Sequence, residues 1–155
     1  MNDGINSREQ SQKKQHSANV VLVGGCFDLI HFGHIEFLRQ AKKHGDCLLI
    51  ALESDENVRR RKGDTRPIHT QEQRKKMLEA ISFVDEVLAL PTMETHREYF
   101  DLVKKIHPNV IAVTEGDPFI EKKKEQAQTV GAAVVIIPKI STPSTSQLAK
   151  LLGLE

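Results

Sequence analysis

Several features that define common protein classes are missing from this chain of 155 residues. No run of apolar residues approaches the roughly 20 needed to cross a membrane, and the N-terminus has no apolar signal core. The formal net charge is only +1, so no strong overall field would attract the chain to DNA or to an anionic membrane surface. These absences predict a protein that binds neither nucleic acid nor membranes.

Cysteine is scarce, and its placement excludes one kind of metal site. The chain has two cysteines, Cys26 and Cys47, which do not form a CxxC pair. A zinc site built on cysteines is therefore not expected, and free thiols fit a reducing compartment. We accordingly predict a cytoplasmic protein.

Two common nucleotide-binding motifs are also lacking. There is no GxxxxGK[ST] segment, the loop of P-loop kinases, and no GxGxxG segment, the fingerprint of dinucleotide-binding domains. P-loop kinases and dinucleotide-dependent dehydrogenases are thus disfavoured. Any phosphate chemistry in this chain must depend on a different loop.

The organisation that remains is that of one domain preceded by a tail. Residues 1–18 are polar, rich in Gln, Ser, Asn and Lys, and we predict that they form a disordered N-terminal tail. Residues 19–155 have a length that suits a single domain with one core.

Five short apolar runs alternate with amphipathic stretches in this domain. The runs lack internal alternation, which is typical of strands buried on both faces of a parallel sheet. Because crossover connections are right-handed, the order predicts an α/β fold: a doubly wound, Rossmann-like five-stranded parallel sheet with helices on both faces. The predicted strands are residues 20–23, 47–52, 84–90, 110–113 and 133–137.

Capping patterns predict where several of the helices begin. Thr70 and Thr95 each precede a Gln or Glu three residues later, which is the capping-box pattern. Asp117 followed by Pro118 predicts an N-cap and a first helical residue. A last short helix is predicted to start at Ser144.

The loop after the first predicted strand carries the strongest chemical signal. In doubly wound sheets, ligands bind at the carboxyl ends of the strands near the switch point. Here Gly24 and Gly25 allow close approach of a ligand, and a helix starting near Gly33 favours phosphate. His31 and His34 flank Gly33. Metal ligation by the two histidines, or a simple helix cap with incidental histidines, are the alternatives.

The segment GCFDLIHFGH resembles the HxGH signature of the cytidylyltransferase-like nucleotidyltransferases, and the likeness extends from Val20 to Leu152. It implies that His31 and His34 contact nucleotide phosphates and stabilise a pentavalent transition state. The implied reaction is attack of an acceptor phosphate on the α-phosphorus of a nucleoside triphosphate, with release of pyrophosphate. An ionised phosphate needs no general base, so no Ser/His/Asp arrangement is required.

The segment KGDTRP, followed by EQR, is similar to the adenylyltransferase domain that makes ADP-heptose and to archaeal FAD synthetases. This resemblance implies that Lys62 and Arg74 contact phosphates, which completes a predicted catalytic set with His31 and His34. We expect the basic run 59–62 to lie in a mobile loop beside the phosphates. A solvated charged face is the alternative.

The other predicted site residues also follow from the resemblance. The loop TEGD and the turn at the last helix match the family's base-reading and phosphate-binding segments, although TEGD departs from the usual sequences. For Asp117 and Ser144, plain helix caps are the alternative, and Arg66 could instead pair with an acid. Nucleotide binding is assigned to Gly25, Cys26, Phe27, Gly33, Glu115, Asp117, Ser144, Thr145 and Ser146, and acceptor binding to Asp28, Arg66 and Lys139.

Two further groups of residues are not expected to act at the site. Lys122, Lys123 and Lys124 are predicted to form a solvated helix face, and Tyr99 is predicted to be a packing residue.

The resemblance favours one reaction and leaves others open. It implies transfer of AMP from ATP to a sugar phosphate such as heptose 1-phosphate. The alternatives are a cytidylyltransferase acting on glycerol 3-phosphate, an adenylyltransferase acting on FMN, and a nucleotide-binding regulatory module without catalysis. The partners are then a nucleoside triphosphate, a phosphorylated small molecule and a second copy of the chain in a homodimer. Mg²⁺ is expected to arrive with the triphosphate, and no protein ligand is assigned to it.

Overall fold

The computed structural model describes residues 18–154, and within them the chain forms five strands and six helices. Within this part of the chain, no helix combines the length and apolar character needed to cross a bilayer. The predicted disordered tail lies outside the described residues except for Ala18. The elements are β1 (Val20–Gly25), α1 (Phe32–Lys42), β2 (Cys47–Leu52), α2 (Asp55–Lys62), α3 (Gln71–Glu79), β3 (Glu86–Ala89), α4 (His96–Ile106), β4 (Val110–Thr114), α5 (Ile120–Val130), β5 (Ala133–Ile137) and α6 (Thr145–Leu151).

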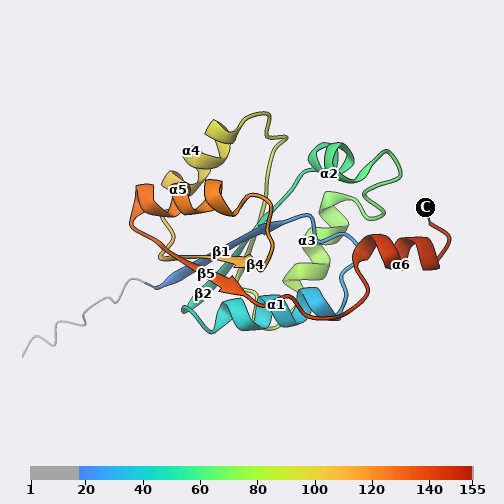
Figure 1. Ribbon diagram of the computed structural model, residues 1–155, viewed down its shortest axis with the longest axis horizontal. Helices are drawn as coiled ribbons and strands as arrows, with labels where there is room; N and C mark the ends of the chain where they lie inside the picture. Colours follow the sequence, from blue (N-terminus) through green and yellow to red (C-terminus); the bar gives the residue numbers. More distant parts are fainter. Residues whose placement is uncertain (1–17, 155) are drawn as a thin grey trace, which may run out of the picture.

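The strands form one parallel sheet in the order β3-β2-β1-β4-β5. Helices α1 and α3 cover one face of the sheet and α4 and α5 the other, while α2 and α6 lie beyond the carboxyl ends of the strands (Figure 1). This arrangement confirms the predicted α/β doubly wound fold. The strand order reverses between β1 and β4, which places the switch point beside the loop that carries the two histidines.

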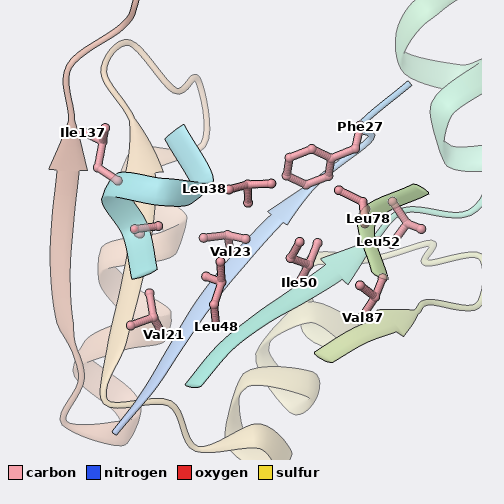
Figure 2. Close-up of a cluster of buried hydrophobic side chains, with 12 residues drawn as sticks. Val21, Val23, Phe27, Leu38, Leu48, Ile50, Leu52, Leu78, Val87 and Ile137 are labelled. Carbon is pink, nitrogen blue, oxygen red and sulfur yellow. The ribbon is translucent and has the colours of Figure 1, made fainter. Parts of the chain in front are cut away.

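Alternation along the buried strands divides the core into two layers. Successive side chains of a strand point to opposite faces, so Val21 and Val23 lie on one side of the sheet and Leu22 on the other. Figure 2 shows the layer beneath α1 and α3, which is built from Val21, Val23, Leu48, Ile50, Leu52, Leu38 and Leu78. The layer beneath α4 and α5 contains Leu22, Leu49, Ala51, Ile111, Val113, Val103 and Ala127.

The predicted helix caps are confirmed at three positions and wrong at one. Thr70, Thr95 and Ser144 are N-caps, each with a complete capping box. Asp117 is not a cap, because α5 begins three residues later with Phe119 at the N-cap position. The Asp117 carboxylate instead accepts a hydrogen bond from the backbone N–H of Phe119 at 2.7 Å, within the turn that precedes the helix.

The basic run 59–62 lies in helix α2, so the expectation that these four residues lie in a loop is wrong, whereas the residues 63–68 that follow are not helical. Ser54 caps α2 by accepting a hydrogen bond from the backbone N–H of Asn57. The first turn carries Asp55 and Glu56, and the last turn carries the four basic residues. Acids at the N-terminus and bases at the C-terminus both complement the helix dipole, which explains why so polar a segment folds as a helix.

A buried ion pair fixes the loop between β1 and α1. Asp28 and Arg66 are each 1% exposed, and Nε of Arg66 donates to Oδ2 of Asp28 at 2.7 Å. The backbone N–H groups of Ile68 and His69 donate to the same carboxylate at 2.8 and 3.0 Å. Burial by itself raises the pKa of Asp28, but these three donors and the Arg66 charge outweigh it and lower the pKa. The carboxylate therefore stays ionised and ties this loop to the segment between α2 and α3.

Replacing Asp28 with Asn should destabilise the fold. The substitution removes the negative charge opposite buried Arg66, and breaking a buried pair on one side typically costs about 3–5 kcal/mol. Urea denaturation would measure the change in the free energy of unfolding. The matched control is Asp101→Asn, because Asp101 pairs with Arg97 in solvent and an exposed pair contributes at most about 1 kcal/mol. Equal losses in the two variants would contradict this account.

Candidate functional site

A cavity of about 520 Å³ opens at the carboxyl ends of β1 and β4. Its wall comes from the end of β1, the first turn of α1, the end of α2, and the segment that runs from β5 into α6. Most of the predicted site residues meet there. They are Gly25, Cys26, Phe27, His31, Gly33, His34, Lys62, Asp117, Lys139, Ser144, Thr145 and Ser146.

The two histidines form a reciprocal cap at the start of α1. Nδ1 of His31 accepts from the backbone N–H of Gly33 at 3.1 Å, and Nδ1 of His34 accepts from the backbone N–H of His31 at 3.3 Å. Their ring centroids are 4.0 Å apart. In a neutral imidazole, one nitrogen accepts and the other carries the proton. The cap therefore places the proton on Nε2 in both rings, so each ring keeps one donor for a ligand.

Both histidines are held in the neutral form. Burial is the main cause that lowers the pKa of His34 to about 4, and the neighbouring His31 ring and Lys62 contribute to the lowering. Burial and Lys62 also lower the pKa of His31 below its ordinary value. The site thus presents two uncharged N–H donors in a cavity wall that also holds Lys62, Lys123 and Lys139.

Close packing at Gly33 joins the start of α1 to the segment before α6. A Cβ on Gly33 would lie 2.8 Å from Cγ2 of Thr142 and 3.0 Å from Cε1 of His31, which is closer than real Cβ atoms approach. Glycine permits this close contact, and a larger residue would force the Thr142 or His31 side chain to shift. Thr142 also lines the cavity, and its place in the turn before α6 is the one feature of the sequence that points to it.

The cysteine in the cavity wall is not suited to act as a nucleophile. Burial raises the pKa of the Cys26 thiol, and this effect outweighs the lowering by nearby cations such as Arg61 and Lys62. A thiol that stays protonated at neutral pH is a poor nucleophile. Cys26 accordingly contributes shape and backbone groups to the cavity.

The structure gives Arg74 a different place from the one predicted. Its side chain is fully buried and does not line the cavity. Its guanidinium nitrogens donate to the carbonyl oxygens of His69 and Cys26 at 3.0 and 2.6 Å, and to Oδ1 of Asp55 at 2.7 Å. As it lies, Arg74 holds the β1 loop and the start of α2 in place and does not reach a phosphate in the cavity.

Three other predicted residues lie outside the cavity wall among the residues that the structure describes. Asp28 and Arg66 form the buried pair described above, so their carboxylate and guanidinium groups face each other and do not face an acceptor. Glu115 turns toward the backbone after β5, where its carboxylate accepts from the N–H of Lys139 at 3.4 Å.

Lys123 is a site residue that sequence reasoning missed. It was expected on a solvated helix face, but it lines the cavity and its Nζ lies 2.5 Å from Oδ2 of Asp117. The spacing of the residues in α5 could have identified Lys123 from the sequence. Ile120, Lys123 and Ala127 follow one another at three and four residues and so share one face of α5, and Ala127 is buried in the core.

Few of the side chains that the structure places at the site are suited to bind a divalent cation. In residues 18–154, no group of three or more His, Cys, Asp or Glu side chains is placed to hold a metal. Mg²⁺ that accompanies a triphosphate is commonly held by phosphate oxygens and water with few protein ligands. At this site, such a cation would therefore be held by the phosphate oxygens of the nucleotide and by water.

Comparison with known proteins agrees with this geometry. The bifunctional protein HldE of Wolinella succinogenes is 36% identical over 151 residues, which cover 94% of this chain but only 30% of that protein. The chain thus spans less than a third of the length of this relative. The FAD synthase of Thermococcus kodakarensis is 41% identical over 137 residues, which cover 85% of this chain and 88% of the synthase.

Solved structures show the same fold at lower identity. The lipopolysaccharide core biosynthesis protein of Thermoplasma volcanium has a TM-score of 0.65 at 22% identity, covering 81% of this chain and 99% of that one. A pantoate-beta-alanine ligase of Francisella tularensis has a TM-score of 0.59 at 15% identity, covering 86% of this chain and 63% of its own. The cytidylyltransferase-like family model matches residues 22–149, and the chain therefore belongs to the cytidylyltransferase-like family.

Proposed function

We propose that the chain is an adenylyltransferase that moves AMP from ATP to the phosphate of a small molecule and releases pyrophosphate. The observation that carries the proposal is the pairing of two neutral imidazole donors, His31 and His34, with the Lys62 cation in the wall of one cavity. The likeness to an FAD synthase, which covers 85% of this chain and 88% of the synthase, supports ATP as the nucleotide. Family membership supports nucleotidyl transfer over a regulatory module without catalysis.

The reaction exchanges one bond at the α-phosphorus for another. An oxygen of the acceptor phosphate attacks the α-phosphorus, a new P–O bond forms, and the bond from the α-phosphorus to the bridging oxygen breaks. Pyrophosphate leaves with that oxygen and its electron pair. Because the acceptor phosphate is already ionised, no side chain has to remove a proton.

The side chains contribute by stabilising charge where it develops. The Nε2–H groups of His31 and His34 would donate to the oxygens of the α-phosphate as negative charge accumulates in the transition state. Lys62, at the end of α2, would supply a positive charge in the wall of the same cavity. Fixed donors of this kind need no reorganisation during the reaction, so they favour the transition state over the bound substrate.

The proposal also includes the metal ion, the residues at the start of α6, the oligomeric state and the location that were predicted from the sequence. Mg²⁺ would neutralise the triphosphate and be held by its oxygens and by water. Ser144 caps α6 with its oxygen, so only its hydroxyl hydrogen is available to a phosphate. A homodimer and a cytoplasmic location also belong to the proposal.

The nucleotide preference can be tested by pyrophosphate release. Wild-type protein with Mg²⁺ should release pyrophosphate from ATP when a suitable phosphate monoester is present, and release from CTP should be at least about tenfold slower. FMN, heptose 1-phosphate and glycerol 3-phosphate are the acceptors to compare. If pyrophosphate is released only from CTP with glycerol 3-phosphate, the chain is a cytidylyltransferase and the proposal is wrong. Nucleotide binding without release from any pair would favour a regulatory module.

His34→Gln should lower kcat by about 10²–10³, which is the usual effect of losing one donor to a developing oxyanion. Steady-state kinetics would measure the loss, and thermal unfolding would show that the variant is folded. His44→Gln is the matched control, because His44 is exposed and lies after the far end of α1. An unfolded His34→Gln variant would instead make His34 a structural residue.

The lowered pKa of His34 predicts an acid-sensitive fold. The unfolded chain binds a proton at His34 near pH 6.5 and the folded chain only near pH 4. Stability is therefore complete above about pH 6.5 and falls as the pH drops toward 4, by about 2–3 kcal/mol at pH 4.5. Urea denaturation at pH 7 and pH 4.5 should show a smaller fall in His34→Gln than in wild type or His44→Gln. The same fall in all three proteins would contradict the assignment.

A further inference from the structure

A second cavity lies on the other side of β1, between the sheet and helices α4 and α5. Its volume is about 130 Å³, and it shares Gly24, Gly25 and Lys123 with the first cavity. A network of polar side chains lies beside it and joins the end of β2 to α2 and α4. The members of this network are Glu53, Asn57, Arg61 and Tyr99.

Glu53 is the buried centre of the network, with only 5% of its surface exposed. Its backbone N–H donates to the carbonyl oxygen of Gly25 at 3.1 Å, which fixes it to the end of β1. Its carboxylate accepts from the Tyr99 hydroxyl at 2.9 Å and from Nδ2 of Asn57 at 3.2 Å, and lies 3.0 Å from the guanidinium of Arg61. These partners satisfy the carboxylate, as the burial of a charge requires.

The hydroxyl of Tyr99 is occupied by the same network. It donates its one proton to Glu53, and nitrogens of Asn57 and Arg61 lie 3.0 and 3.1 Å from its oxygen as donors. Burial, followed by the nearby Glu53 carboxylate, raises the pKa of Tyr99 to about 12, so the hydroxyl keeps its proton at neutral pH. Tyr99 is thus more than the packing residue expected from the sequence, because its hydroxyl helps to hold Glu53 and Arg61 together.

The last turn of α2 depends on this network for its position. Residues 59–65 are all exposed, and the ion pairs that Arg59 and Arg60 make lie in solvent, where such pairs contribute little to stability. Arg61 differs from them, because its partner Glu53 is buried and bound to the sheet. The contact between Arg61 and Glu53 therefore anchors the end of the helix.

Arg61 and Lys62 are neighbours in α2, but they face different cavities. Successive residues of an α-helix point about 100° apart, and Arg61 lines the second cavity whereas Lys62 lines the first. An anchor on Arg61 therefore fixes how the end of the helix is rotated, and this rotation sets the point from which the Lys62 side chain extends. Because a lysine side chain is long and flexible, the place of its charge depends on how firmly its backbone is held.

We infer that Glu53 is a positioning residue for nucleotidyl transfer, which acts through Arg61 to hold Lys62 in the wall of the first cavity. The inference rests on the proposed role of Lys62 in that reaction. Among the described residues, Glu53 is not part of the wall of the first cavity, and its carboxylate is bound by Arg61 and Tyr99. Glu53 thus affects the rate through Lys62, because a charge stabilises the transition state only when it is correctly placed.

A double-mutant cycle between Glu53 and Lys62 tests the inference. Glu53→Gln keeps the size of the side chain and an oxygen that accepts from Tyr99, but it removes the charge opposite Arg61. The assay uses ATP, Mg²⁺ and whichever of FMN, heptose 1-phosphate and glycerol 3-phosphate gives the fastest pyrophosphate release. Glu53→Gln should lower kcat about tenfold in the wild-type background. In Lys62→Met it should change kcat less than about twofold, because the lysine that it positions is absent.

Glu94→Gln is the matched control for this cycle. Glu94 pairs with Arg60, the residue before Arg61, but this pair lies in solvent, so kcat should stay within about twofold of the wild-type value. Urea denaturation shows whether each variant is folded. Equal losses of kcat from Glu53→Gln with and without Lys62 would overturn the inference, because Glu53 would then act on the acceptor or on the fold as a whole. An unchanged kcat in folded Glu53→Gln would also overturn it.

Nucleotide binding separates this inference from the proposed transfer. If the wild-type protein releases no pyrophosphate, the transfer is contradicted, and the cycle is measured instead as the Kd of a non-hydrolysable ATP analogue by calorimetry. A loss of affinity of about threefold in Glu53→Gln that disappears in Lys62→Met would support positioning without transfer, and equal losses would overturn it. A Lys62→Met protein as active as wild type would contradict both proposals. If Glu53→Gln fails to fold, Arg61→Met breaks the same contact from its more exposed side and takes its place in the cycle.

Discussion

The site depends on the buried charge pair between Asp28 and Arg66. The two residues beside Asp28, Phe27 and Leu29, have positive φ angles of 47° and 54°, a conformation that costs free energy for residues other than glycine. Hydrogen bonds from Arg66, Ile68 and His69 hold the carboxylate between them. A strained loop can persist only where its surroundings fix it, and here the fixed loop leads directly to the first histidine of the cap.

Arg74 extends this restraint from the loop to α2. Because it binds the Cys26 carbonyl and the Asp55 carboxylate together, the loop after β1 and the start of α2 cannot move independently. Lys62 lies at the other end of the same helix, so its distance from the histidines is set through the helix. Arg74 of the EQR segment thus positions backbone around the site, while Lys62 and Lys123 line the cavity.

The sequence was sufficient for the fold and for the centre of the site, and the reasons are physical. Strands buried on both faces are recognisable as uninterrupted apolar runs, and HFGH places two imidazoles at a helix start in any fold of this class. The sequence was insufficient to predict the positions of Arg66, Arg74 and Lys123. A basic residue looks identical in the sequence whether its side chain faces a ligand or a buried carboxylate. Only the tertiary structure shows whether a cation faces a ligand or a carboxylate. The same holds for α2, because its run of basic residues was equally consistent with a loop.

The carboxyl end of β1 lies between two cavities with different linings. The neutral histidines and three lysines (Lys62, Lys123 and Lys139) line the first cavity, whereas the other cavity is shaped by Ala51 and by residues of α4 and α5. Substitutions in α4 or α5 can therefore reshape the second cavity without moving His31 or His34, since those histidines are held by α1 and the Asp28 pair. Lys123 is the exception, because it lines both cavities, and a change there would alter the two cavities together.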